Sequence, residues 1–159
     1  MKKVTDFLDA HGVKYIFHEH PPVFTCEEAE EHAKNVPGIA GKNLFLRDKN
    51  GKQYYLVVLP AFKRIDLKAF AKMIETPKVS FASDEALEEK LGLKPGSVSV
   101  FGLINDPENT ITLYIDADIH NAEIVNFHPN DNHASLELTK EMFHKYLETI
   151  PHEARIHNF

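Results

Sequence analysis

The feature that most constrains the fold is a hairpin pattern between Ala40 and Leu59. Leu44 and Leu46 alternate with Phe45 and Arg47, the segment 48–51 (Asp-Lys-Asn-Gly) follows, and the apolar run Tyr55 to Leu59 comes next. Asn-Gly is a strong turn signal because both residues tolerate positive φ. A run that is apolar at nearly every position indicates a strand buried on both faces. The stretch therefore predicts a β-hairpin whose second strand lies near the middle of a sheet.

The rest of the chain combines helical and extended patterns. Asp66, Ser83 and Thr139 are suited to cap helices because their side-chain oxygens accept hydrogen bonds from free backbone N–H groups, and Gly92 is placed to end one. The patterns predict helices over 4–11, 25–35, 66–74, 84–91 and 139–150, and strands over 13–18, 79–82, 98–104, 110–116, 123–127 and 134–138. A hairpin turn is expected at 105–109 and a loop at 128–132. This order of elements predicts an α+β fold.

Length and composition limit the class of protein. With 159 residues, 43% of them hydrophobic and 26% charged, the chain has the composition of a single globular domain, residues 1–159. No apolar run approaches the ~20 residues of a membrane helix, and the first residues lack the apolar segment of a signal peptide. Cys26 is the only cysteine, which excludes an intrachain disulfide. We therefore expect a cytoplasmic protein without a membrane segment.

Charge is unevenly distributed along the chain. The net charge is −6, but nine basic and three acidic residues between Lys42 and Lys78 give this basic segment a charge of +6. The net charge argues against a general nucleic-acid binder, and we expect no DNA partner, but a basic segment in an acidic chain can guide one polyanion while the remainder discourages indiscriminate binding. The same lysines also fit a solvated helix face and a hairpin tip, so both interpretations stay open.

Familiar metal, cofactor and nucleophile motifs are missing from the sequence. Among ten histidines, the pair His18 and His20 would share one face of a strand, but no third ligand is identifiable. Ser97 lacks a Gly-x-Ser-x-Gly elbow, and Cys26 is a small apolar residue at a predicted helix start. No glycine-rich phosphate or dinucleotide loop is present. We therefore predict no metal and no cofactor.

Polar residues gather instead at three predicted junctions between strands and loops, where functional sites usually lie. These are Lys42-Asn43, Gly96-Ser97, and His128 with Asn132. A cation at the mouth of a central strand suits an anionic or carbonyl-bearing ligand, although Lys42 also fits a solvated edge. A buried, hydrogen-bonded histidine is the simpler interpretation of His128.

Several separated blocks carry a family likeness. They are His20 to Thr25 (HPPVFT), Gly41 to Asp48 (GKNLFLRD), Leu91 to Val98 (LGLKPGSV), Phe101 to Asp106 (FGLIND), and Asn126 to Pro129 (NFHP) with Asn132. In this order they resemble the freestanding aminoacyl-tRNA deacylases related to the editing insertion domain of bacterial prolyl-tRNA synthetase (the YbaK/PrdX group). The likeness spans Val4 to Tyr146 and is greatest to members that hydrolyse Ala-tRNA(Pro).

The resemblance implies a fold and a set of site residues. The fold would be one compact domain with a curved, mixed, largely antiparallel sheet flanked by helices. Lys42 falls on the family's functional lysine, Asn43 belongs to the same motif, and His128 falls on the histidine that lines the aminoacyl pocket. Gly96 begins the family's Gly-x-x-x-Pro loop, in which Val100 replaces the final proline. This departure puts the rigidity of the loop and the choice of amino acid in question.

The resemblance also implies a cofactor-free ester hydrolysis. Backbone N–H groups around Gly96 and Ser97 would stabilise the oxyanion, and Lys42 would either hold the terminal phosphate or ribose or shift the electrostatics of the ester. Phe24 and Thr25 would contact the terminal adenosine by stacking and hydrogen bonding. Asn43, Asn132 and Val100 complete the predicted substrate-binding set.

The resemblance predicts a trans-editing hydrolase that deacylates mischarged Ala-tRNA(Pro). A pocket shaped for proline cannot strongly reject the smaller alanine, because each missing methylene changes binding by only ~1–3 kcal/mol, so a second pocket adds discrimination. The expected partner is the acceptor end of tRNA(Pro) carrying a small amino acid, with prolyl-tRNA synthetase as a second candidate. Alternatives are Cys-tRNA(Pro) or another small aminoacyl ester, or a non-catalytic module that binds aminoacyl-tRNA or synthetase.

Overall fold

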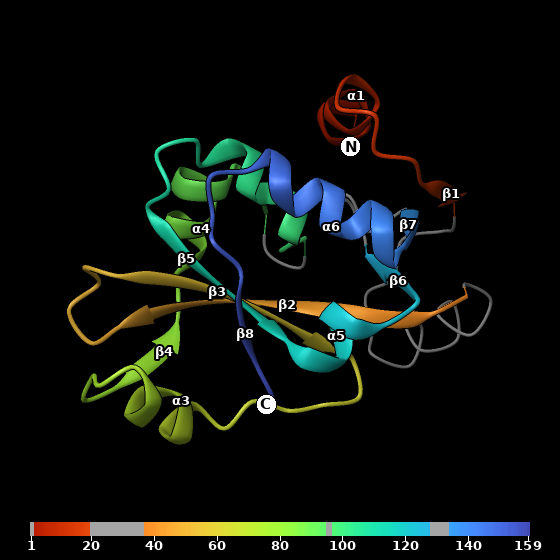
Figure 1. Cartoon of the computed structure of the whole chain (residues 1–159). Coiled ribbons are helices and arrows are strands. Elements are labelled where there is room, and N and C mark those ends of the chain that lie inside the picture. The colour runs from red at the N-terminus through yellow and green to blue at the C-terminus, as the bar shows by residue number, and fades with distance from the viewer. Residues whose placement is uncertain (1, 20–36, 95–96, 128–133) are drawn as a thin grey trace.

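The computed structural model describes residues 2–19, 37–94, 97–127 and 134–159. Short helices and strands alternate along the chain (Figure 1). They are α1 (Lys2–Ala10), β1 (Ile16–Glu19), β2 (Ile39–Asp48), β3 (Tyr54–Pro60), α3 (Leu67–Met73), β4 (Val79–Phe81), α4 (Asp84–Leu91), the 3-10 helix η1 (Val100–Asn105), β5 (Ile111–Asp116), α5 (Ala117–Asn121), β6 (Ile124–Phe127), β7 (Ala134–Thr139), α6 (Lys140–Thr149) and β8 (Arg155–His157).

The eight strands form one mixed sheet. Its order is β1-β7-β6-β2-β3-β5-β8, and β4 pairs with β2 beside this path. The pairs β1–β7, β6–β7, β2–β3 and β2–β4 are antiparallel, whereas β2–β6, β3–β5 and β5–β8 are parallel. The predicted α+β class, with a mixed and mainly antiparallel sheet flanked by helices, is confirmed.

The predicted hairpin is β2 and β3, paired from Gly41↔Pro60 to Arg47↔Tyr54. Residues 56–60 are buried, as expected for a central strand. Only Gly51 of the Asn-Gly pair adopts positive φ (+65°), and its N–H donates to the Asp48 carbonyl at 3.2 Å. The turn is therefore longer than a two-residue loop, in which both residues would need positive φ.

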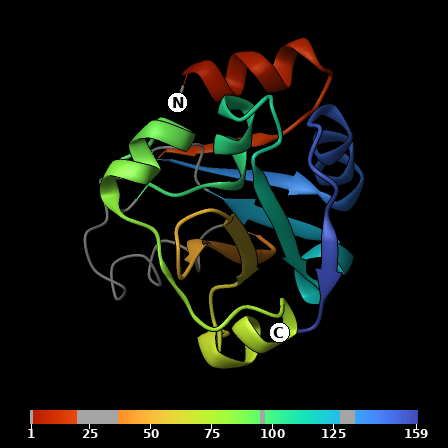
Figure 2. The ribbon, with the colours of Figure 1, turned by 90° about the vertical axis from the view of Figure 1, so that its left-hand side faces the viewer.

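Helices cover both faces of this sheet. On one face, α1, α4, η1 and α6 pack over β2, β3 and β5 and bury Leu8, Phe101 and Tyr146 completely. On the other face, α3 packs through Phe70 and Ala71 against Leu46, Val57 and Leu59. Figure 2 shows α1 and α3 on opposite sides of the strands. Alternate residues of β2 therefore face two different cores.

The prediction of a strand over 98–104, followed by a hairpin turn, is wrong. Residues 100–105 form the 3-10 helix η1, in which Ser99 Oγ accepts a hydrogen bond from the Phe101 N–H at 3.2 Å. Val100 to Leu103 are buried around the whole helix, and a short apolar run buried on all sides has no periodicity that separates helix from strand. The turn at 105–109 joins η1 to β5 instead of joining two paired strands.

The sequence patterns did not predict two of the observed elements, and two predicted elements fall on residues that the structure does not describe. Helix α5 and strand β8 were not expected, whereas the predicted caps Asp66, Ser83 and Thr139 all accept backbone hydrogen bonds at their helices. The predicted helix at 25–35 and loop at 128–132 lie outside the described residues.

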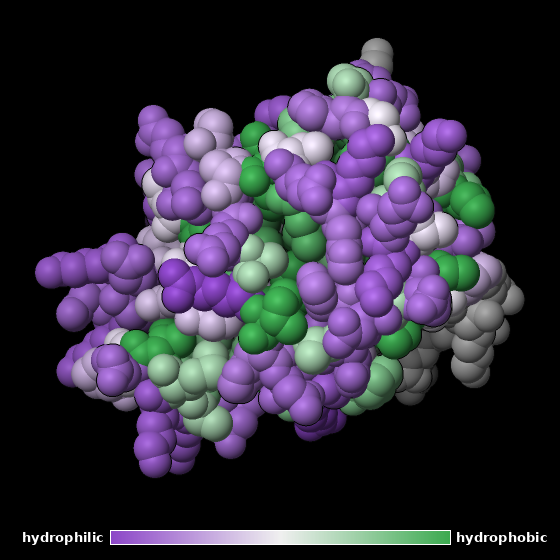
Figure 3. Space-filling view, viewed as in Figure 1, coloured by the Kyte–Doolittle hydropathy of each residue, from purple (hydrophilic) through white to green (hydrophobic). Residues whose placement is uncertain are grey.

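In the described part, no helix is long and apolar enough to cross a membrane. The surface in Figure 3 is mostly hydrophilic, with small, separated hydrophobic patches.

Candidate active site

Lys42 and Asn43 lie on the central strand β2 and face opposite sides of the sheet. Side chains alternate along a strand, and Asn43 shares the face of buried Phe45, whereas Lys42 shares the face of Leu44 and Leu46. Lys42 is the fourth residue of β2 and pairs with Leu59, so it lies inside the strand and not at its mouth. The two adjacent residues therefore cannot approach a ligand from the same side.

Asn43 is fixed by the backbone of η1. It is 9% exposed, and its Oδ1 accepts a hydrogen bond from the Val100 N–H at 3.1 Å. Because that partner is a donor, the amide must turn its oxygen to Val100 and its Nδ2 elsewhere. Nδ2 is buried and has no hydrogen-bond partner among the residues that the structure describes. A buried amide donor without a partner is costly and requires an explanation.

Val100 is held at both of its backbone polar groups. Its carbonyl accepts a hydrogen bond from the Tyr146 hydroxyl at 2.8 Å, on the other side from Asn43. Tyr146 is fully buried, and burial raises the pKa of its hydroxyl, which stays a protonated donor. The Val100 side chain is also fully buried, so this residue can act on a substrate only by holding its loop.

The edge of β2 opposite β3 changes partner along its length. It pairs with β6 at residues 39 and 40 and with β4 at residues 46 to 48. Within the described ranges, no strand pairs with this edge between those two points. Lys42 and Asn43 lie in this interval, which we call the open edge of β2. A ligand that approaches the open edge can meet Lys42 on one face and Asn43 on the other.

Gly41 is required by the packing of β6 against the start of β2. A Cβ at Gly41 would overlap the ring of Phe127, the last residue of β6. Asn126, also on β6, donates through Nδ2 to the carbonyl of Pro37 at 3.2 Å and ties the segment before β2 to the same strand. The sequence blocks that contain these residues therefore reflect packing that positions Lys42.

Of the other predicted site residues, the structure describes Ser97 and leaves the rest outside its described ranges. Ser97 is half-buried, and its N–H donates to the Lys94 carbonyl at 3.0 Å, so this N–H is already used in a turn. His128, Gly96, Phe24, Thr25 and Asn132 lie outside the described residues. Their roles stay predictions.

A charged cluster at the ends of β3 and β5 was missed by sequence reasoning. The Asp116 carboxylate is fully buried, and Lys63 Nζ donates to both of its oxygens at 3.1 and 3.2 Å. Lys63 also pairs with Asp118 at 2.9 Å and donates to Asn158 Oδ1. The hydrogen bond that the Lys63 ammonium donates to Asp118, together with Asp116, raises the pKa of Lys63. The spacing of these residues in the sequence gave no signal that they meet.

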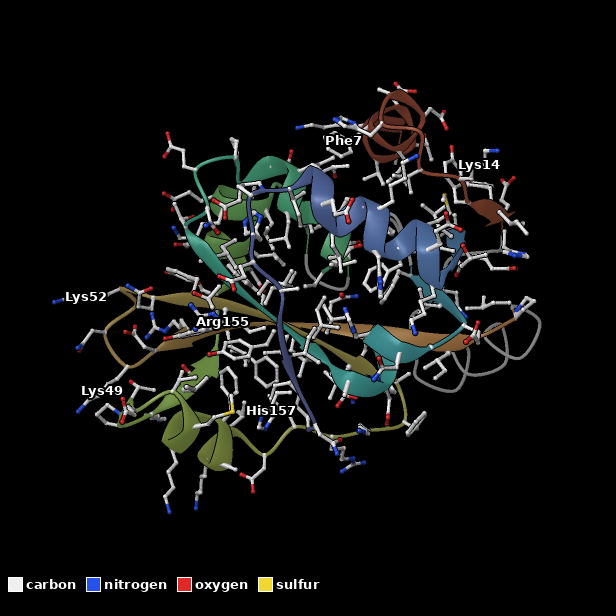
Figure 4. The ribbon with its side chains drawn as sticks, in the orientation of Figure 1. Phe7, Lys14, Lys49, Lys52, Arg155 and His157 are labelled. Atoms are coloured by element: carbon white, nitrogen blue, oxygen red, sulfur yellow. The ribbon has the colours of Figure 1, made fainter. Side chains whose placement is uncertain are left out.

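The basic segment is not one surface patch. Lys49 and Lys52 lie at the hairpin tip, at the left of Figure 4. Because Lys49 is seven residues beyond Lys42, the two are ~20 Å apart along the strand direction. Lys63 is neutralised by Asp116 and Asp118. Only part of the +6 charge is therefore close to the open edge.

No group of three or more His, Cys, Asp or Glu residues that could hold a metal occurs in the described ranges. His18 instead contacts Glu137 Oε1 at 3.0 Å on the neighbouring strand.

This architecture matches a known family. A model of the aminoacyl-tRNA editing domain matches residues 20–146. The chain belongs to this family. The resemblance seen in the separated sequence blocks is thereby confirmed, as is the class of enzyme, an aminoacyl-tRNA deacylase.

Individual relatives agree with this assignment. The chain is 41% identical over 142 residues to the prolyl-tRNA editing protein ProX of Acetoanaerobium sticklandii, covering 89% of this chain and 86% of ProX. It is 33% identical over 155 residues to prolyl-tRNA synthetase associated domain-containing protein 1 of Mus musculus, covering 96% and 92%. A crystal structure of a candidate trans-editing enzyme for prolyl tRNA synthetase superposes with a TM-score of 0.74 at 22% identity, covering 99% and 94%. That structural likeness bears on the fold alone.

Proposed function

We propose that this protein hydrolyses the ester of a small amino acid, alanine first, that has been wrongly attached to tRNA(Pro). Membership of the editing family and the relative named a prolyl-tRNA editing protein support this proposal. The observation that carries it furthest is the open edge of β2, with Lys42 on one face and, on the other, a buried Asn43 Nδ2 that has no partner among the described residues. Such a site suits a ligand with both an anionic group and a carbonyl oxygen.

In the proposed reaction a water oxygen attacks the ester carbonyl. Negative charge develops on the carbonyl oxygen, and the Asn43 Nδ2–H is the proposed donor to it. Its orientation is already fixed by Val100, and preorganised donors of this kind contribute ~3–4 kcal/mol to a barrier. The ester bond then breaks, and the amino acid leaves while the ribose oxygen takes a proton. A hydroxyl of the tRNA ribose, as the resemblance suggests, assists the removal of the water proton.

Lys42 has a separate role in this proposal. An ammonium group attracts phosphate as a point charge, and from its face of β2 Lys42 would hold the terminal phosphate or ribose of the tRNA. Holding the tRNA end places the ester at the open edge, because positioning lowers the entropic cost of the reaction. His128 would line the aminoacyl pocket, and Phe24 and Thr25 would contact the terminal adenosine.

The choice of amino acid rests on the size of this pocket. A pocket that accepts alanine and excludes proline adds discrimination that the synthetase pocket lacks. Cysteine and serine esters are the nearest competing substrates. The reaction would take place in the cytoplasm, where tRNA(Pro) is charged, with prolyl-tRNA synthetase as a candidate partner.

The test is a deacylation time course with purified protein on Ala-tRNA(Pro), with Pro-, Cys- and Ser-tRNA(Pro) in parallel. We expect rapid loss of alanine and retention of proline. Loss of cysteine or serine instead would change the substrate and keep the mechanism. No cleavage of any ester, with synthetase added, would refute the proposal and favour a binding module.

Lys42→Ala provides the residue-level test. We expect deacylation to fall by at least 100-fold at unchanged thermal stability, because Lys42 is half-buried and outside the main core. Lys49→Ala, at the hairpin tip, is the matched control and should keep normal activity. Wild-type rates in Lys42→Ala would remove Lys42 from the mechanism. Activity should also survive EDTA, and a reversible loss would point to a metal.

A further inference from the structure

The turn that follows β3, beside the proposed site, exposes the aromatic ring of Phe62 to solvent. Phe62 is 75% exposed, the highest value among the large hydrophobic side chains that the structure describes as exposed. It lies between β3 and α3, in the connection drawn in yellow in Figure 1, on the side of the sheet away from the hairpin tip. Exposing a phenylalanine forgoes the ~2–3 kcal/mol that its burial would contribute, so its position requires a reason.

The turn is anchored on both sides of Phe62. The Ala61 N–H donates to the Ala40 carbonyl at 2.8 Å, and the Lys63 N–H donates to the Pro60 carbonyl at 2.9 Å. The Lys63 ammonium is fixed in turn by the buried carboxylate of Asp116 and by Asp118. The missed charged cluster thus has a structural consequence, because it fixes the backbone that presents Phe62. A backbone fixed in this way loses little conformational entropy when a ligand stacks on the ring that it presents.

The surroundings of Phe62 favour an anionic ligand that also carries flat rings. Arg64, two residues further on, is exposed, and its guanidinium makes no hydrogen bond or ion pair with any residue of the described ranges. An exposed aromatic ring beside a cation is the pattern used to bind single-stranded nucleic acid, through base stacking and phosphate contacts.

Phe62 also lies at a suitable distance from Lys42. Ala61 bonds to Ala40, which precedes Lys42 by two residues, or ~7 Å of strand. With the reach of the side chains added, the ring lies roughly 10–15 Å from the reacting end. Stacked nucleotides advance roughly 3.4 Å each, so Phe62 would meet a base about three to four nucleotides before the one that carries the ester.

We propose that Phe62 is a stacking site for an unpaired base of the tRNA acceptor end, upstream of the terminal adenosine. This inference rests on the proposed function for the identity of the RNA. It assigns to Phe62 a positioning role in substrate binding and no part in the chemical step.

Fluorescence tests the contact without relying on catalysis. The chain contains no tryptophan, so Phe62→Trp introduces a single fluorophore at the turn. Titration with uncharged tRNA(Pro), and separately with a short single-stranded RNA that ends in CCA, should quench this fluorescence saturably. Phe81→Trp is the matched control, because Phe81 is 58% exposed on β4 and pairs with Leu46, nearer the hairpin tip. Its fluorescence should not change.

Binding and kinetics complete the test. Phe62→Ala should bind the same RNA roughly 5- to 100-fold more weakly, raise KM for the aminoacyl-tRNA by a similar factor, and change kcat by less than about two-fold. Phe62→Leu, which keeps the bulk but not the ring, should behave in the same way, and both variants should unfold at the wild-type temperature.

The outcomes separate this inference from the proposed function. Normal RNA affinity in Phe62→Ala and Phe62→Leu, or unchanged Phe62→Trp fluorescence at RNA concentrations that saturate binding, overturns the stacking site. If esters are cleaved in that case, the proposed function stands alone. If no ester is cleaved but Phe62→Trp is quenched and Phe62→Ala binds weakly, the stacking site stands and the deacylase proposal fails.

Discussion

Replacement of Val100 by proline tests how the loop before η1 is held. The backbone accepts proline at this point, because Val100 begins η1 and Ser99 is extended (φ −147°, ψ 145°), which suits the residue before a proline. Proline, however, has no N–H, and its Cδ takes the position of the hydrogen that now faces Asn43 Oδ1, with N and Oδ1 only 3.1 Å apart. Asn43 would have to move, and its buried amide would lose the hydrogen bond that it accepts from residue 100.

The magnitude follows from these two effects. Leaving a buried acceptor without a partner costs about 1–3 kcal/mol. A compatible proline restricts the unfolded chain and returns about 0.4–1 kcal/mol. The expected net loss for Val100→Pro is about 1–2 kcal/mol in the free energy of unfolding, which corresponds to a Tm lower by about 2–8 °C for a chain of this size. Urea unfolding and calorimetry measure both quantities.

A double-mutant cycle isolates the cause. In an Asn43→Ala background no acceptor faces residue 100, so Val100→Pro should be neutral or stabilising there. The coupling between the two positions should then be about 1–3 kcal/mol. An equal cost of Val100→Pro with and without Asn43 would refute the reasoning, as would a higher Tm of the single variant.

Two further predictions concern packing and pH. Gly41→Ala should destabilise the protein by at least about 1–3 kcal/mol in urea unfolding, because the added Cβ overlaps the Phe127 ring, and wild-type stability would contradict the packing. Asp106 is 5% exposed, and although burial raises its pKa, hydrogen bonds from Thr110 and His152 lower the pKa below its ordinary value near 3.8. Its contribution to stability should therefore be complete above pH ~4 and disappear as the pH falls through the lowered pKa. Asp106→Asn should show a flatter Tm between pH 5 and 2.5, and an unchanged slope would count against the assignment.

Local chemistry was sufficient to predict much of the fold. Ser83 and Gly92 bracket α4, and Asp66 and Thr139 cap α3 and α6, because a cap depends only on residues within one turn. The β2–β3 hairpin followed from alternation and a turn of four residues. Strand β8 could not be found in this way, since its three residues are all exposed and form no apolar pattern.

Long-range contacts explain what the sequence did not reveal about the site. Lys63 and Asp116 are 53 residues apart, and Val100 and Asn43 are 57 apart, so neither pair has a local signature. The opposite orientation of Lys42 and Asn43, in contrast, follows from the two-residue period of a strand and was available from the sequence. Each residue of the motif Gly41-Lys42-Asn43 has a different role in β2. Gly41 leaves space for the Phe127 ring, Lys42 places a cation on one face of the sheet, and Asn43 places an amide on the other.

The opposite orientation of Lys42 and Asn43 determines how a ligand can reach both side chains. If Lys42 and Asn43 were on the same face, one side of the sheet would hold both the tRNA and the ester, and the other would be free to pack. With the residues on opposite faces, only a ligand at the strand edge can reach both, and among the described residues this edge lacks a partner strand where β2 passes from β6 to β4. In the described part of the chain, the change of strand partner is therefore what leaves this edge open, and the buried contacts of Asn43, Val100 and Tyr146 fix the orientation of the Asn43 amide. If the proposed editing site lies here, it should remain small, because the packed core that surrounds Asn43 resists expansion around a larger amino acid.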